Sequence, residues 1–184
     1  MAFFNFGKSG KKSTLGIDIG TASVKIVELA RENSRYKLQN YALFAIEDKS
    51  TNAELDQALA WGIRETLTRG GINARDAVAS IGSVNTFSTV ITMPYLSEQD
   101  IAKTIPFEAR KYVPVPLDQV VLDWSIISVA PAAGGQILQA PQAGGKPPLV
   151  EVYLVAVSKT ETERYKRIMT GAGLNLRALE LENS

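Results

Sequence analysis

The alternation of apolar and polar residues predicts three strands in the first quarter of the chain. Leu15–Asp18 is a short apolar run, and Val24–Ala30 follows it after a Gly-Thr turn. Tyr36–Ile46 is the third run, and the short polar spacers between the three predict an antiparallel meander. Because successive side chains of a strand point to opposite faces, one parity of the third strand should share a face: Tyr36, Leu38, Ala42, Phe44 and Ile46.

Helical spacing begins next, at Thr51. Thr51 and Glu54 have the form of a capping box, in which a hydroxyl and an acidic side chain satisfy free amides of the first turn. Gly70-Gly71 predicts the end of this helix, and Ala77–Ile81 has the composition of a buried strand. The apolar face of the helix consists of Leu55, Ala58, Leu59, Ile63 and Leu67.

A second group of elements begins near Asn85. Phe87–Met93 predicts a strand, and Ser97 is the expected N-cap of a helix that Pro114 and Pro116 end. Pro106 lies inside this helix, where a proline removes a backbone hydrogen bond and predicts a kink. The apolar stripe of the helix consists of Ile101, Ile105, Ala109 and Tyr112.

The remaining chain predicts two strands, a helix and a final strand. Gln119–Val129 and Leu149–Val157 flank a segment rich in Gly and Pro, about 131–148, which predicts a flexible hairpin loop. A helix is expected from Ser158 until Gly171 and Gly173 terminate it, and Leu174–Leu181 is the last expected strand. We interpret Trp61 and Trp124 as packing residues.

Composition removes several kinds of chemistry. Lys and Arg number 20 against 19 Asp and Glu, so a net charge of +1 gives no overall basic field for nucleic acid. The sequence has no Cys and no His. Thiol nucleophiles, Cys/His zinc sites and Ser-His-Asp triads are therefore excluded.

The N-terminal segment 1–13 begins with MAFFNFGKSGKK. Its apolar patch is too short for a signal-peptide core, and its lysines follow that patch rather than precede it. We expect a flexible leader. The alternative is a weak membrane-surface contact through Phe and Lys, since one short anchor binds only marginally.

The candidate chemistry lies in the first turn. Asp18 ends the first strand, Gly20 permits close approach of backbone, and Thr21 and Ser23 add hydroxyls beside Lys25. Amides of such a turn can point at anionic oxygens, and Asp18 can hold Mg²⁺ through water. The residues predict a partial phosphate-binding site. The alternative from the residues alone is an ordinary hairpin turn with a solvated lysine.

At these residues the chain resembles a known family. LGIDIGTASVKIVEL is similar to the first phosphate-binding hairpin of the actin/hexokinase/Hsp70 ATPases, and within them to the PilM family of type IV pilus assembly. MPYLSEQDIAKTIPFEARKYVPVPLDQVVLDWSII resembles a longer pattern of that family, and GLNLRALELENS resembles the segment that leads into its second half.

The resemblance implies an α+β (α/β) fold: one actin-like, ribonuclease H-like half with an inserted subdomain of the FtsA/PilM type. The core would comprise 14–82, the insert 83–173, and 174–184 would be a return strand toward a second half. ATP with Mg²⁺ would bind between two halves in the full-length protein, and no nucleotide is expected on this chain alone. We expect no catalysis, or a weak ATPase in the full-length protein.

The implied partner is the N-terminal peptide of PilN, an inner-membrane protein. The peptide would occupy a groove between the subdomains, and the residues expected there are Ile101, Ile105, Glu108 and Tyr112. An internal pair of Glu108 with Arg110 or Lys111 is the alternative. The resemblance also implies an indirect link to the pilus assembly ATPase, no nucleic acid, and a cytoplasmic location beside the inner membrane, reached through PilN. Two other functions stay open: an FtsA-like membrane-tethered filament protein and a fragment of a hexokinase-type small-molecule kinase.

Overall fold

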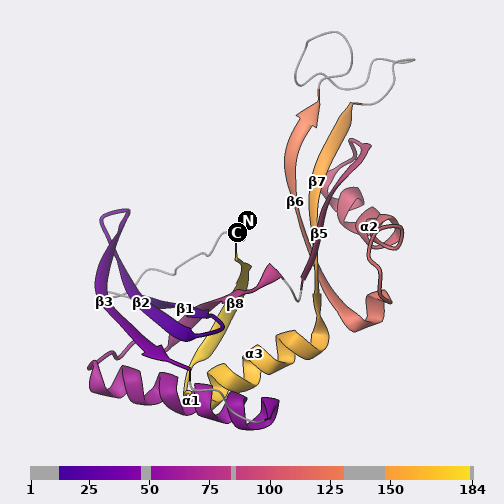
Figure 1. Cartoon of the computed structure of the whole chain (residues 1–184). Coiled ribbons are helices and arrows are strands. Elements are labelled where there is room, and N and C mark those ends of the chain that lie inside the picture. The colour runs from indigo at the N-terminus through magenta and orange to yellow at the C-terminus, as the bar shows by residue number, and fades with distance from the viewer. Residues whose placement is uncertain (1–12, 47–50, 84–85, 131–147, 183–184) are drawn as a thin grey trace. The chain divides into compact units, whose positions relative to one another are not determined.

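The computed structural model describes residues 13–46, 51–83, 86–130 and 148–182, which form two compact units (Figure 1). Thr86–Lys159 form the insert unit, and the described residues on either side of it form the core unit. Residues 1–12 of the predicted leader (1–13) and 131–147 of the predicted hairpin loop (about 131–148) lie outside the described residues, whereas Ser13 is the first residue of strand β1.

The core unit is built on a five-stranded sheet of order β3-β2-β1-β4-β8. Strands β1, β2 and β3 form the predicted antiparallel meander, while β4 runs parallel to β1 and β8 runs parallel to β4. The mixed sheet therefore has β3 and β8 at its edges. The bounds are Ser13–Ile19 for β1, Ser23–Glu32 for β2, Arg35–Ala45 for β3, Asp76–Ile81 for β4 and Asn175–Leu181 for β8.

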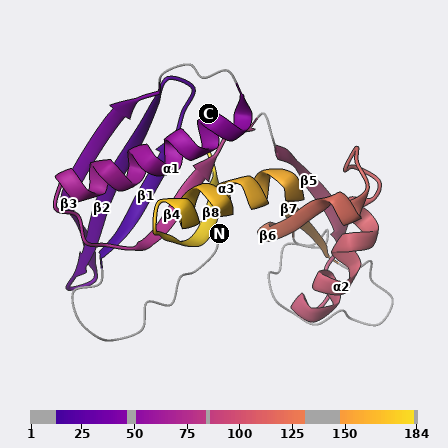
Figure 2. The same ribbon diagram turned by 90° about the horizontal axis from the view of Figure 1, so that it is seen from below.

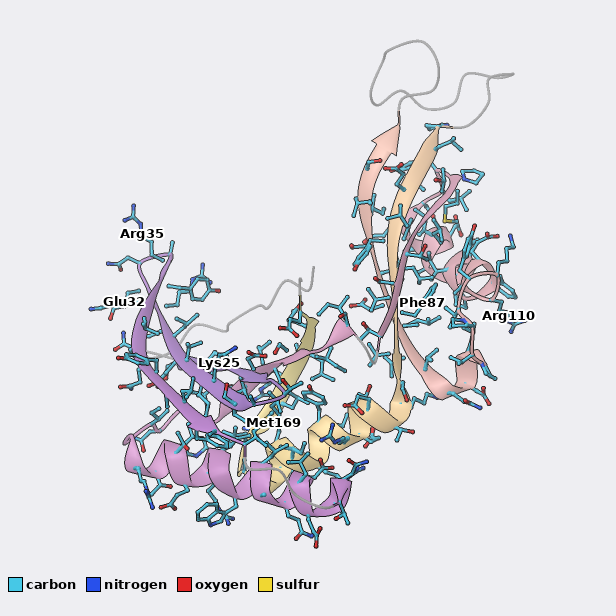
Figure 3. The ribbon with its side chains drawn as sticks, viewed as in Figure 1. Lys25, Glu32, Arg35, Phe87, Arg110 and Met169 are labelled. Carbon is cyan, nitrogen blue, oxygen red and sulfur yellow. The ribbon has the colours of Figure 1, made fainter. Side chains whose placement is uncertain are left out.

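Helices α1 (Asn52–Arg69) and α3 (Lys159–Gly171) cover one face of this sheet (Figure 2). The predicted cap of α1 is present, because Thr51 Oγ1 accepts a hydrogen bond from the Glu54 amide at 3.2 Å. Met169 of α3 is fully buried (Figure 3). The core consists of apolar side chains from both layers, among them Leu15, Ile17, Val24, Ile26, Leu59, Ile63, Leu67, Ala77, Ala79, Tyr165 and Ile168.

A β-bulge changes the expected face of two residues in β3. The β2–β3 register shifts between Glu28 and Leu29, so that Tyr41 lies opposite Val27 but Leu38 lies opposite Leu29. The extra residue turns the start of β3 over. Tyr36 and Leu38 therefore lie on the face away from the helices, whereas Phe44 stays on the helix side, and the prediction that they share a face is wrong.

The second boundary between the units also differs from the expectation. The structure places it at Lys159, not after Gly173, so α3 belongs to the core unit. The reason is packing against α1: a Cβ on Gly171 would lie 3.0 Å from the Ala60 Cβ. In addition, Arg164 Nε lies 2.7 Å from Asp56 Oδ1.

The insert unit is an antiparallel sheet of order β5-β7-β6 with helix α2 (Glu98–Ala109) packed on it. Strand β5 spans Thr86–Pro94, β6 spans Val120–Ala130, β7 spans Leu149–Ser158, and a short 3-10 helix, η2, spans Leu117–Gln119. The shared core is apolar: Ile91, Met93, Ile101, Ile105, Ala109, Val113, Val120, Val150, Val152, Leu154 and Ala156.

Helix α2 ends one turn earlier than its apolar stripe predicts. Its last turn tightens, because the amides of Lys111 and Tyr112 donate to the carbonyls of Glu108 and Ala109, three residues back. Tyr112 consequently leaves the stripe and is 43% exposed, and Val113 is buried instead.

Candidate functional site

The candidate phosphate site lies on the face of the core sheet away from the helices. Asp18 lies opposite Lys25 on β2 and beside Ser80 on β4. Lys25 Nζ donates to Asp18 Oδ2 at 2.9 Å, and Ser80 Oγ donates to Asp18 Oδ1 at 2.7 Å. Side chains from the two neighbouring strands, β2 and β4, thus hold the Asp18 carboxylate of β1 by both oxygens. The Lys25 side chain is 60% exposed and leaves its remaining donors to solvent (Figure 3).

The two hydrogen bonds set the charges of the site. The bond from Ser80, followed by the bond from Lys25, lowers the pKa of Asp18 below its ordinary value. The bond to Asp18 and the charge of Asp18 raise the pKa of Lys25. Both groups are therefore charged at neutral pH, and the pair offers an ammonium beside an oriented carboxylate.

The turn between β1 and β2 carries the rest of the predicted site. Gly20 N–H donates to the Ser23 carbonyl at 3.0 Å, so this amide closes the turn and is not available to a phosphate. A Cβ at Gly20 would lie 3.2 Å from that carbonyl oxygen, which explains why the position suits glycine. Thr21 is exposed at the tip and Ser23 is half-buried. The hairpin thus brings Asp18, Gly20, Thr21, Ser23 and Lys25 to one end of the sheet.

The donor set fits only a water-mediated role for magnesium. Asp18 supplies one carboxylate, and within the described ranges no group of three or more acidic, His or Cys side chains gathers to hold a metal. A hard cation that keeps several waters suits such a single carboxylate.

Ser80 is a neighbour of the candidate site that the sequence analysis missed. One sequence feature could have identified Ser80. It is a polar residue in the apolar strand Ala77–Ile81, and the alternation of side chains along a strand puts it on the face opposite Ala77 and Ala79. The parallel pairing of β4 with β1, which brings Ser80 to Asp18, has no local signal.

We expect Ser80→Ala to raise the pKa of Asp18 toward its ordinary value, because the bond from Ser80 is the largest cause of its lowering. A lowered folded-state pKa contributes stability above the unfolded pKa and loses it as pH falls through the folded pKa. The variant should therefore lose less stability on acidification than the unsubstituted chain. Carbon-detected NMR titration of the Asp18 carboxyl measures the shift, with Ser88→Ala on β5 as the control. An unchanged Asp18 midpoint in Ser80→Ala would contradict the assigned cause.

The residues expected in the partner-peptide groove separate into core and surface. Ile101 and Ile105 are 0% and 1% exposed in the core of the insert unit, which leaves no side-chain surface for a peptide. Glu108 pairs with Lys111, whose Nζ lies 2.8 Å from both carboxylate oxygens, as in the internal alternative. Tyr112 is 43% exposed, and the neighbouring Phe107 is 65% exposed beneath the Arg110 guanidinium at 5.6 Å.

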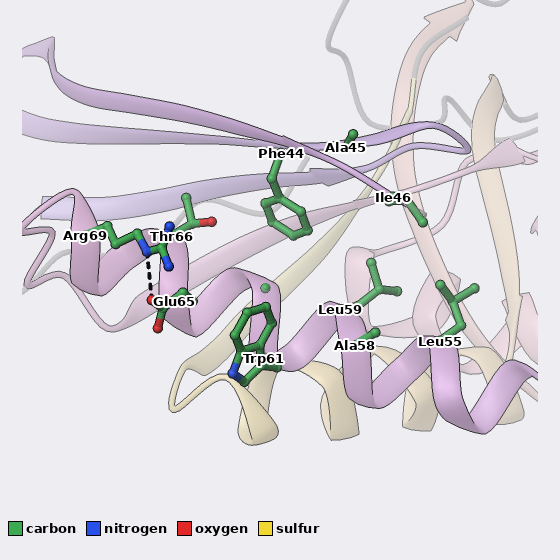
Figure 4. A pocket seen from close by; sticks show the side chains of 11 residues that line it. Phe44, Ala45, Ile46, Leu55, Ala58, Leu59, Trp61, Glu65, Thr66 and Arg69 are labelled. Carbon is green, nitrogen blue, oxygen red and sulfur yellow. Dashed lines mark hydrogen bonds and ion pairs between the residues drawn. The ribbon is translucent and has the colours of Figure 1, made fainter. Parts of the chain in front are cut away.

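A hollow of about 470 Å³ lies beside the edge strand β3 and helix α1 (Figure 4). Phe44 reaches into it from β3, and Trp61 stands at its rim with 59% of its surface exposed. The interpretation of Trp61 as a packing residue is therefore wrong, whereas Trp124 packs against the insert core as expected. No helix within the described ranges is long and apolar enough to cross a membrane.

Comparisons with known proteins agree with this fold. The family described as "Type IV pilus assembly protein PilM" matches residues 16–183. A solved PilM-PilN type IV pilus biogenesis complex matches with a TM-score of 0.73 and 23% identity, over 94% of this chain and 48% of that one. The cytoplasmic domain of EpsL, an inner-membrane component of the type II secretion system of Vibrio cholerae, matches with a TM-score of 0.50 and 11% identity, over 91% of this chain and 57% of that one.

The likeness to the first of these structures confirms the expected actin-like fold class with α+β architecture. The chain spans about half the length of the solved chains it matches.

Proposed function

Because the chain belongs to the PilM family of type IV pilus assembly proteins, we propose that it is a scaffold of pilus assembly that docks the N-terminal peptide of PilN. The observation that carries this proposal is the likeness, over 94% of the chain, to a chain of a solved PilM-PilN type IV pilus biogenesis complex. The proposal includes a cytoplasmic position beside the inner membrane, reached through PilN, and an indirect link to the assembly ATPase.

The surface of the insert unit next to α2 supports peptide binding there. Phe107 and Tyr112, five residues apart in the chain, each expose a large apolar side chain, and exposed aromatic side chains are common anchors of interfaces. Glu108, which lies between them in the sequence, has a side chain that is 27% exposed, so its carboxylate can accept hydrogen bonds from peptide amides. Ile101 and Ile105 act indirectly, as the packed support of this surface.

Calorimetric titration of the chain with a synthetic PilN N-terminal peptide tests the proposal. We expect saturable binding that a scrambled peptide does not reproduce, and a roughly 10-fold weaker affinity for Tyr112→Ser, which corresponds to about 1.4 kcal/mol. Tyr36→Ser removes an exposed tyrosine from the core unit and should leave the affinity unchanged. Absence of saturable binding by the folded, unsubstituted chain would refute peptide docking on this chain.

Nucleotide binding is a second part of the proposal, and it concerns the full-length protein. Asp18 and Lys25 offer one ammonium and one carboxylate for the phosphates of ATP and a hydrated Mg²⁺. A single hairpin supplies neither an adenosine pocket nor a second phosphate loop. The proposed role of this chain is therefore binding rather than catalysis, and titration with MgATP is the parallel control in the same experiment.

A further inference from the structure

Glu28 of strand β2 is a buried carboxylate on the opposite face of the core sheet from the candidate phosphate site. Within the described ranges it is the only charged residue that is buried, with 7% of its surface exposed. It lies on the helix side of the sheet, opposite Leu15 of β1 and Asn40 of β3. Burying a carboxylate costs free energy unless hydrogen bonds replace those to water. Its position therefore needs an explanation other than apolar packing.

The Glu28 carboxylate joins three strands. Ser13 Oγ of β1 donates to its Oε1 at 2.6 Å, and Asn40 Nδ2 of β3 donates to its Oε2 at 2.5 Å. Both donors are neutral, so they supply hydrogen bonds but no ion pair. Replacing a buried ionic group by a well-packed apolar one is often neutral for stability, and the best-attested role of such groups is to select one register. The pairing of β2 with β3 gives this role a physical basis, because it contains two registers.

The tip of the β2–β3 hairpin sets the first register. Glu32 pairs with Arg35 across Asn33 and Ser34, whose φ angles of 46° and 68° fit a two-residue type I′ turn (Figure 3). In a hairpin the type and length of the turn fix the register of the strands that it joins. The tip therefore determines how the two strands would pair along their whole length if nothing interrupted the ladder.

Glu28 marks the point at which the register changes. The register of the tip, continued without interruption, would pair Glu28 with Gln39. The structure pairs Glu28 with Asn40 instead, and Gln39 is the additional residue of the bulge. Because β3 pairs only with β2 among the described strands, a shift of β3 by one residue would break no other ladder. The bond from Asn40 to Glu28 therefore lies where it can hold the base of the hairpin out of the register of the tip.

The register at the base decides which side chains of β3 flank the candidate phosphate site. Ala45 lies opposite Ser23, and Leu43 lies opposite Lys25, so a small side chain stands beside the hydroxyl of the first turn. A shift of one residue turns every side chain of a strand to the other face. In the register of the tip, Phe44 would leave the helix side of the sheet and lie opposite Ser23.

We propose that Glu28 is a positioning residue of the candidate phosphate site, and that it holds β3 in the register that keeps Phe44 away from Ser23. The consequence for phosphate binding rests on the proposed nucleotide role, whereas the register does not depend on it. Packing of Phe44 on α1 favours the same register, since a Cβ on Gly62 would lie 2.7 Å from its ring. We therefore expect loss of the carboxylate to populate the second register as a minor form rather than to unfold the sheet.

Cross-strand nuclear Overhauser effects in Glu28→Leu measure the register directly. Lys25 and Leu43 form a non-hydrogen-bonded pair, because the Ile46 amide bonds across the hairpin three positions further along and the two kinds of pair alternate. Their Hα atoms are therefore close and give a strong signal in the unsubstituted chain. We expect Glu28→Leu to show a second set of β3 signals, in which the Lys25 Hα contacts Ala42.

Two further variants separate control of the register from a general loss of structure. Glu28→Gln keeps an acceptor for Ser13, and Asn40 can turn its amide to accept from the new side chain, so one register should remain. Deletion of Gln39 removes the additional residue and gives the tip and the base the same register. Glu28→Leu combined with this deletion should therefore show a single register, with Leu43 beside Lys25.

These measurements need no nucleotide. A second register in Glu28→Leu that the deletion of Gln39 removes would support the proposal. A single register in Glu28→Leu, with Lys25 in contact with Leu43 only, would overturn it and assign the register to Phe44 packing. A second register that persists after the deletion would overturn it as well, because the turn would not be its source. Failure of the unsubstituted full-length protein to bind MgATP would refute the nucleotide role and leave the register result intact.

Discussion

Replacing Leu154 with Ala is expected to destabilise the insert unit by about 2–5 kcal/mol, because the side chain is removed from a fully packed site. Leu154 is 0% exposed and lies opposite Trp124, which packs against the same core. The unit has a three-stranded sheet and the single helix α2 among its described residues, so few neighbours can collapse into the cavity. Urea unfolding followed by Trp124 fluorescence, in a Trp61→Phe background, measures the change for this unit.

Leu149→Ala is the matched control for that prediction. Leu149 is the same residue type on the same strand, but it is 47% exposed, and surface substitutions usually change stability by about 0.5 kcal/mol. A loss for Leu154→Ala no larger than that of Leu149→Ala would contradict the assignment of Leu154 to the core. Ile105 and Leu154 share this core beneath α2. If the proposed peptide-binding surface lies next to α2, the same substitution should also weaken peptide binding.

The strands were predictable from the sequence, because the period of two is local information. Each run predicted as a strand, from Leu15 to Leu181, forms a strand in the structure. The antiparallel meander was predictable because only short polar segments connect its three strands. The face of Tyr36 and Leu38 was not predictable. One additional residue in β3 reverses their parity, and a bulge is fixed by pairing with β2 rather than by the residues of β3 alone.

Only the first of the two boundaries between the core unit and the insert unit was predictable from the sequence. Asn85 marks the change from core to insert in both sequence and structure, whereas α3 belongs to the core through Gly171 and Arg164. One apolar face on a helix predicts that the helix packs against another element, but the pattern does not identify which sheet that is. The same limit explains Ser80, whose meaning depends on the parallel pairing of β4 with β1.

The sequence predicted which residues of the first hairpin form the candidate phosphate site, but only part of how their side chains are arranged. Asp18 and Lys25 meet because they are cross-strand neighbours in a two-strand hairpin, which is short-range information. The partner-groove residues were chosen from one helical stripe, and a stripe marks the buried side of α2. Ile101 and Ile105 are therefore core residues, while the exposed aromatic residue Phe107 lies outside the stripe.

Replacing Arg164 with Met is expected to destabilise the core unit by about 1–3 kcal/mol, because it leaves partly buried carboxylates without their main partner. Arg164 Nε lies 2.7 Å from Asp56 Oδ1 on α1, and its Nη1 lies 3.1 Å from Glu161 Oε1. The three side chains are only 16–27% exposed, so water screens them poorly. Met keeps most of the apolar stem, which confines the change to the charge and its hydrogen bonds. Native-state hydrogen exchange of the Leu15 and Ile17 amides measures the free energy of unfolding of this sheet.

Lys166→Met is the matched control on the same helix. Lys166 pairs with Glu163 at 2.7 Å, but these side chains are 54% and 58% exposed, and an exposed pair contributes about 0–1 kcal/mol. Asp56→Asn combined with Arg164→Met should cost less than the sum of the two single changes, because the double variant leaves no unpaired Asp56 charge. Equal losses of stability for Arg164→Met and Lys166→Met would mean that apolar packing, rather than the Arg164–Asp56 ion pair, holds α3 against α1. The attachment of α3 to the core unit would then depend on Tyr165, Ile168 and Met169.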